Sequence, residues 1–152
     1  MRKKINSKRA IFTIASRNYS AMARVMLLSS INYNPDVDHY YFLVDEDGSG
    51  IVDANDNIYL IKANEIGIVD FGNMSFYYNV TELNTAIKPF AFKFLLDEGY
   101  ESVLYFDPDI CIYSPLEVIY NHLRKNAVLL TPRITAPIGE EDKCVPHEIV
   151  HL

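Results

Sequence analysis

Two aspartates, Asp107 and Asp109, are separated only by Pro108 and follow a run of apolar, strand-forming residues. Two carboxylates at the end of a buried strand are costly unless a positive charge compensates them. Pro108 fixes its own backbone and favours an extended Asp107, so both side chains can be directed at one point. A hard divalent cation, held by one or two carboxylates and substrate phosphates, suits such a pair. The alternative is an acidic turn, because Asp and Pro are both common in turns.

The strand that positions this pair is expected at Ser102 to Phe106. Its residues are apolar on both faces, as in a strand buried inside a parallel sheet. In open α/β sheets, ligands bind beyond the carboxyl ends of the strands. The aspartates are therefore predicted to lie at the ligand-binding edge of the sheet.

The first third of the chain has the pattern of a strand, a helix and a second strand. We expect a buried strand at Ala10 to Ala15, a helix at Tyr19 to Ile31 and a strand at His39 to Val44. Ser16 or Asn18 can cap the helix. The turn before the helix presents free backbone N–H groups, which suit the carbonyls or phosphates of a ligand. This pattern predicts an α/β protein.

The acidic segment Asp45 to Asp56 is similar to a calcium-binding EF-hand loop, with Gly50 in the required position. Its last position is Asp56, which is shorter than the usual bidentate Glu. The flanking residues are typical of strands, whereas the EF-hand needs two helices. A polar loop between two strands, the second at Asn57 to Lys62, is the favoured interpretation.

A helix is expected to begin at Asn79, because Glu82 lies three residues on, as in a capping box. The preceding residues, Glu65 to Tyr78, are expected to be loop or weak helix. Pro89 is predicted to interrupt the helix after Thr81 to Lys88, with a second segment at Pro89 to Glu98. Lys88 then lies at an irregular point where its amine can turn inwards; the alternative is a solvated lysine.

After the aspartates, we expect an extended segment at Ile110 to Tyr113, a short helix at Pro115 to Leu123 and a buried strand at Val128 to Thr131. Beyond Pro132 the sequence loses periodicity, and residues 139–152 are expected to form a poorly structured tail. This region contains three residues with spacing suited to zinc, but no second pair closes a structural site: Cys144, His147 and His151.

The length, net charge and composition of the chain exclude several classes of protein. The chain has 152 residues, enough for one domain with a real core. Its net charge of −6 argues against general nucleic-acid binding. No apolar run approaches the roughly 18–20 residues of a membrane span, and no signal peptide is evident. The two cysteines make no disulfide framework, which favours a location in the reducing cytoplasm. The basic residues within 1–9 are expected to form a frayed terminus; weak contact with anionic lipid at the inner membrane face is the alternative.

Four segments together resemble a known family. They are IASRNY (Ile14 to Tyr19), VTELNTAIKPF (Val80 to Phe90), EGYESVLYFDPDICIYSPL (Glu98 to Leu116) and LLTPRITAPI (Leu129 to Ile138). This combination resembles the nucleotide-sugar-binding half of a GT-A-fold glycosyltransferase, more narrowly the bacterial relatives of the glycogenin-like family 8 enzymes. The resemblance implies a Rossmann-like α/β fold with a mostly parallel sheet, and a single donor-binding domain over residues 1–152.

The resemblance also implies roles for individual residues. Asp107 and Asp109 match the family's D-x-D aspartates, which hold a divalent metal, usually Mn²⁺ (or Mg²⁺), that bridges the donor's diphosphate. Lys88 matches the basic residue that faces the donor sugar or phosphate. The turn after the first strand contacts the nucleoside in the family, and here it comprises Ala15, Ser16, Arg17 and Tyr19. No residue is singled out as catalytic.

The implied function is metal-dependent transfer of a sugar from a nucleotide diphosphate, a UDP-sugar, to a saccharide or lipid-linked acceptor in surface-polysaccharide synthesis. GT-A transferases have a second half, which supplies the acceptor pocket and a further metal ligand, often a His; His147 and His151 are possible substitutes. This chain ends shortly after the segment where that half is expected to begin. The alternative is therefore an inactive or truncated nucleotide-sugar-binding module that needs missing sequence or a partner. Exposed apolar surface near the C-terminus would favour that alternative.

Overall fold

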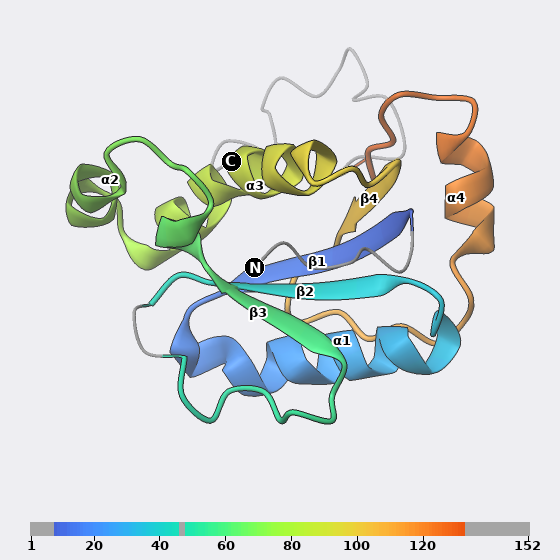
Figure 1. The fold of residues 1–152 in the computed structure, drawn as a ribbon, viewed down its shortest axis with the longest axis horizontal. Helices are drawn as coiled ribbons and strands as arrows, with labels where there is room; N and C mark the ends of the chain where they lie inside the picture. Colours follow the sequence, from blue (N-terminus) through green and yellow to red (C-terminus); the bar gives the residue numbers. More distant parts are fainter. Residues whose placement is uncertain (1–7, 46–47, 133–152) are drawn as a thin grey trace, which may run out of the picture.

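The computed structural model describes residues 8–45 and 48–132, which form one parallel sheet with helices on both faces (Figure 1). The strand order is β3-β2-β1-β4, and every neighbouring pair is parallel. This arrangement confirms the expected α/β class. The elements in chain order are β1 (Arg9–Ala15), the 3-10 turn η1 (Arg17–Tyr19), α1 (Ser20–Tyr33), β2 (Asp38–Leu43), β3 (Ile58–Lys62), the 3-10 turn η2 (Ala63–Glu65), α2 (Phe71–Tyr77), α3 (Val80–Asp97), β4 (Ser102–Tyr105) and α4 (Glu117–Leu123).

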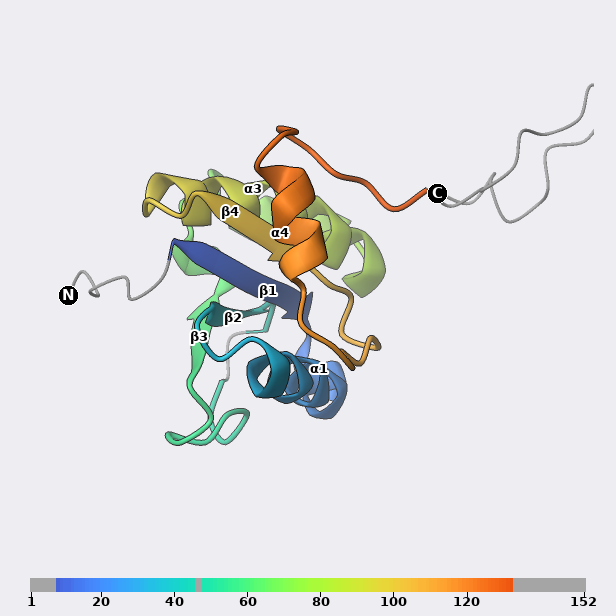
Figure 2. The same cartoon turned by 90° about the vertical axis from the view of Figure 1, so that its right-hand side faces the viewer.

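The core lies on both faces of β1 and β2, because their side chains alternate between two helical layers. On one face Phe12 and Phe42 pack against α3, and Phe12 meets the ring of Phe92 edge to face at 4.8 Å. On the other face Ile11 packs with α4 and Tyr41 with α1, so these two helices share one side of the sheet (Figure 2). Because all strands are parallel, their carboxyl ends meet at one edge.

Helix α3 is continuous from Val80 to Asp97, so the predicted interruption at Pro89 is wrong. The capping box of Asn79 and Glu82 is confirmed at its start. Pro89 cannot donate to the carbonyl of Thr85, but both residues are exposed, so water can satisfy that carbonyl. The helix persists because one row of side chains is buried along its whole length: Leu83, Ile87, Ala91 and Leu95.

The later strands differ from expectation. β4 pairs with β1 alone among the described residues, so it is an edge strand. Its side chains are only partly buried except for that of Leu104, whereas the sequence predicted a strand buried on both faces. Ile110 to Tyr113 forms no strand, and neither does Val128 to Thr131, where Val128 is 68% and Leu130 85% exposed. Strand formation requires pairing with a neighbour, and neither segment pairs with the open edge of β4 or with another described strand. The segment expected to be weakly helical contains a regular helix, α2.

Lys8 and Arg9, two basic residues that the sequence analysis placed in a frayed terminus, both form ion pairs. Lys8 pairs with Glu101, and Arg9, the first residue of β1, pairs with Glu117 at 2.8 Å. The predictions for residues 1–7, for the tail and for Cys144, His147 and His151 concern positions outside the described residues. Within the described part of the chain, no helix is long and apolar enough to cross a membrane.

A buried histidine should make stability depend on pH. His39 is 2% exposed and its Nε2 lies 2.9 Å from the Ser30 hydroxyl. Burial lowers the pKa of His39 from 6.5 to about 4, and neighbouring Asp38 and Asp36 offset this only in part. The unfolded chain therefore binds a proton that the folded chain excludes. As pH falls from 6.5 to 4, we expect the free energy of unfolding to drop by about 3 kcal/mol through this group.

Urea unfolding across this pH range measures the effect. His39→Gln is expected to reduce the decline in the free energy of unfolding. His122→Gln, which alters an exposed histidine, should leave that decline unchanged. An undiminished decline in His39→Gln would contradict the assignment.

Candidate functional site at the carboxyl edge of the sheet

The two aspartates lie in a turn immediately after β4. The Asp107 carbonyl accepts a hydrogen bond from the Ile110 amide at 3.2 Å, so residues 107–110 form a β-turn. The turn follows the carboxyl end of β4. The sequence analysis treated an acidic turn as the alternative to a site at the carboxyl edge of the sheet. In the structure the two aspartates lie in a turn and also at that edge.

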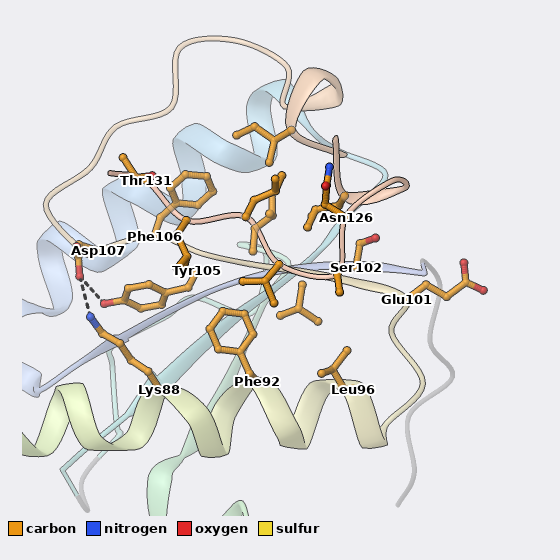
Figure 3. Close-up of a pocket in the computed structure, with 18 residues that line it drawn as sticks. Lys88, Phe92, Leu96, Glu101, Ser102, Tyr105, Phe106, Asp107, Asn126 and Thr131 are labelled. Carbon is orange, nitrogen blue, oxygen red and sulfur yellow. Dashed lines mark hydrogen bonds and ion pairs between the residues drawn. The ribbon is translucent and has the colours of Figure 1, made fainter. Parts of the chain in front are cut away.

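Lys88 reaches Asp107 across the edge of the sheet, as Figure 3 shows. The Lys88 Nζ lies 3.6 Å from Asp107 Oδ1 and 4.4 Å from the centre of the Tyr105 ring. The Tyr105 hydroxyl donates to the same Asp107 oxygen at 2.5 Å. The lysine amine thus turns inwards, as one of the two interpretations expected. Its position on a regular helix, and not an irregularity at Pro89, produces this direction. Lys88 follows buried Ile87 directly, on the flank of α3 that faces β4.

Tyr105 is a functional candidate that the sequence analysis missed. Burial raises its pKa, and so do its hydrogen bond to Asp107 and the negative charges of Asp107 and Asp109. The phenol therefore remains a protonated donor to Asp107 at neutral pH. The sequence does place Tyr105 two residues before Asp107, and residues two apart in an extended segment lie on the same side. This spacing could have identified the tyrosine.

The ion pair at the site is largely open to solvent. The Asp107 side chain is 59% exposed and that of Lys88 is 32% exposed. Such pairs contribute little to stability, since water screens them and ordering the side chains costs entropy. Lys88 and Asp107 can therefore separate and bind ligand groups instead, at a low cost in free energy.

Asp109 is exposed and lies on the other side of the turn. It lines a small groove with the first half of α1, next to Met22 and Val25, whereas Asp107 lines a larger groove beside β4. Among the described residues, no group of three or more His, Cys, Asp or Glu side chains could hold a metal. Two carboxylates suit a hard cation when substrate phosphates complete its coordination. The structure thus places the two carboxylates in different grooves and does not direct them at one point, which corrects that expectation.

The four predicted residues of the first turn lie at the same edge of the sheet. Ala15 and Ser16 are buried, whereas Arg17 and Tyr19 are exposed. The Ser16 hydroxyl donates to the Asn18 side chain, and neither residue caps α1, which corrects that expectation. The Arg17 amide donates to Asp45, and its guanidinium donates to the Ser49 carbonyl at 3.1 Å.

The acidic loop after β2 is bound to α1 by arginine, which the sequence pattern did not reveal. Arg24 contacts Asp56 through its Nε at 2.7 Å and also pairs with Asp53. Because Asp45 accepts from the Arg17 amide, three carboxylates of this calcium-like segment already have donors. Strands β2 and β3 flank the loop, so the interpretation as a loop between strands is confirmed.

A groove of about 880 Å³ extends from Lys88 and Asp107 along β4. Its walls come from β4, α3, α4 and residues 126–131 (Figure 3). Most of the lining is apolar, and the polar groups lie near its ends. The candidate site therefore opens onto an apolar groove.

The parallel four-stranded sheet with helices on both faces matches the GT-A glycosyltransferase fold. A solved structure of the galactosyltransferase LgtC, in complex with donor and acceptor sugar analogs, is similar to this chain. The TM-score is 0.51 and the sequence identity 17%, over 74% of this chain and 42% of that chain. The chain thus spans less than half the length of this structure. No protein-family model matches the chain, and no curated protein matches it.

We expect the residues of this site to contribute little to folding. Because the ion pair is exposed, Lys88→Met should change the free energy of unfolding by less than about 1 kcal/mol. Phe12→Ala, in the core of the same sheet, should cost about 3–5 kcal/mol. Urea denaturation measures both. A loss in Lys88→Met comparable to that in Phe12→Ala would make the lysine a structural residue.

Proposed function

We propose that this chain is the donor-binding part of a metal-dependent glycosyltransferase of the hexosyltransferase type. The donor is a nucleotide diphosphate sugar, a UDP-sugar, and the acceptor is a saccharide or a lipid-linked saccharide of surface-polysaccharide synthesis. The reaction takes place in the cytoplasm or at the inner face of the membrane. The observation that carries the proposal is the convergence of Lys88 and Asp107 at the carboxyl edge of a GT-A fold.

The roles of the residues follow from their contacts. Tyr105 donates to one oxygen of Asp107, so the second carboxylate oxygen would hold a Mn²⁺ or Mg²⁺ ion. Asp109 would join this ion after its exposed side chain turns towards Asp107. That ion, when bound, neutralises the diphosphate leaving group as the sugar–oxygen bond breaks. Lys88, released from Asp107, contributes a further positive charge to the same diphosphate. Ala15, Ser16, Arg17 and Tyr19 bind the nucleoside.

A second function is favoured by the exposed apolar surface near the end of the described chain. Leu130 is 85% exposed and borders the groove beside β4. Apolar surface of this kind usually marks an interaction site. The alternative is therefore a nucleotide-sugar-binding module that completes transfer only with further polypeptide.

Calorimetric titration of UDP into the protein, with and without Mn²⁺, tests the donor site. We expect binding that requires the ion and is lost in the double variant Asp107→Asn/Asp109→Asn. Lys88→Met should weaken binding by about tenfold or more, because a charged hydrogen bond to phosphate is removed. Asp97→Asn, which alters an exposed aspartate at the far end of α3, is the matched control and should bind normally.

Release of UDP from UDP-sugars in the presence of saccharide acceptors separates the two functions. Binding with transfer would establish the enzyme, and binding without transfer would establish the module. A folded protein that binds no UDP at millimolar Mn²⁺ would contradict both.

A further inference from the structure

Helix α1 is apolar on its outer side as well as on the side that packs against the sheet. Its buried side includes Ala23, Met26 and Leu27. Its outer side is formed by uncharged residues only: Ala21, Met22, Val25, Leu28, Asn32 and Tyr33. A helix that is apolar all round is normally buried all round. The outer side of α1 is therefore expected to have a partner.

The segment after the acidic turn extends this apolar surface. The Ile112 amide donates to the Ser29 hydroxyl of α1 at 2.9 Å, so the segment lies against the helix. Ile110 is 42% exposed and lines a small groove with Met22 and Val25. Figure 2 views α1 nearly along its axis and shows the segment passing beside it. The exposed residues of α1 together with Ile110 form one surface, the α1 face.

Four residues of the α1 face have the spacing of a helix–helix seam. They are Ala21, Val25, Leu28 and Asn32, at intervals of four, three and four residues. This is the d-a-d-a spacing of a coiled coil, with a β-branched residue at position a, Leu at position d and an Asn that can fix the register. Such a seam packs against another helix of the same pattern, so the α1 face is complementary to itself.

Electric charge favours a second copy over other occupants. The one charged residue of α1 is Arg24, and it pairs with Asp53 and Asp56 of the acidic loop. An anionic membrane surface or a nucleic acid would require basic residues on the α1 face, which consists of uncharged ones. The chain has a net charge of −6, so two copies repel unless they meet through uncharged surface. The α1 face is such a surface.

We propose that the α1 face is the interface of a two-fold symmetric dimer, in which α1 packs antiparallel to α1 of a second copy. Val25 of each copy then lies against Leu28 of the other, and Ala21 lies against Asn32. Each layer of the seam thus combines a smaller and a larger side chain, which fills space better than pairs of identical residues. Because the contact is isologous, it closes at two copies.

The dimer places a second copy next to the candidate site. Asp109 of the acidic turn lines the same small groove as Met22 and Val25, so the partner helix lies beside that turn. The proposal goes beyond donor binding and does not rest on it, since the α1 face is defined by α1 and Ile110 alone.

Sedimentation equilibrium of the full chain at increasing concentration tests the dimer. We expect a monomer–dimer equilibrium with a Kd in roughly the micromolar range, because the seam is short. Val25→Asp should weaken association by at least about a hundredfold, since it buries an unpaired carboxylate twice in each dimer. Val80→Asp is the matched control, because Val80 is 49% exposed at the start of α3, on the opposite face of the sheet. This variant should dimerise normally.

A mixture of two variants tests the antiparallel pairing itself. Leu28→Lys alone should be monomeric, like Val25→Asp. Mixed together, the two should form a dimer, because the Asp of one copy meets the Lys of the other while the second central layer stays apolar. Far-UV circular dichroism checks that each variant is folded, as expected for positions that are exposed in the monomer.

Four outcomes would overturn the proposal. A chain that stays monomeric up to millimolar concentration would show that the α1 face has no affinity for itself. Dimers that persist in Val25→Asp, or that are lost equally in Val80→Asp, would place the contact elsewhere. Growth beyond the dimer would mean that the contact does not close. Failure of the mixed variants to associate would exclude antiparallel packing. UDP titration is a separate measurement, so failure of the donor site leaves each of these results intact.

Discussion

The burial of β1 between two parallel neighbours is the constraint on which the rest of the structure depends. Its residues from Ala10 to Ala15 are almost entirely withdrawn from water, with α3 on one face and α1 and α4 on the other. A parallel sheet needs this double cover, because both of its faces are apolar. Parallel strands also bring their carboxyl ends together. The first turn, Lys88 and the acidic turn meet at one edge because β1 holds the sheet in this order.

The core of the protein also sets the geometry of the candidate site. The buried row from Leu83 to Leu95 holds α3 against the sheet and keeps it helical through Pro89. Lys88 follows the buried Ile87, so packing directs its amine towards Tyr105 and Asp107. The polar contacts themselves are exposed and weakly held. A rigid scaffold thus carries charged groups that can rearrange around a ligand.

β4 contributes both to the candidate site and to one wall of the groove. The Tyr105 side chain donates to Asp107 at the candidate donor site, whereas its backbone faces the empty side of the groove. Val128 and Leu130, which also line this groove, are exposed in the described chain. The candidate site therefore lies at the end of an open apolar surface.

The sequence by itself determined the α/β class, the first strands, the capping box of α3 and the position of Asp107 after β4. These features depend on local periodicity and on short-range hydrogen bonds, which a linear pattern records. Tertiary structure alone decided the continuity of α3 through Pro89, the role of Tyr105, and the pairing of Arg24 with Asp53 and Asp56. It also decided that residues 128–131 form no strand despite their apolar composition. A strand is defined by pairing with a neighbour, and the presence of that neighbour is a property of the whole fold.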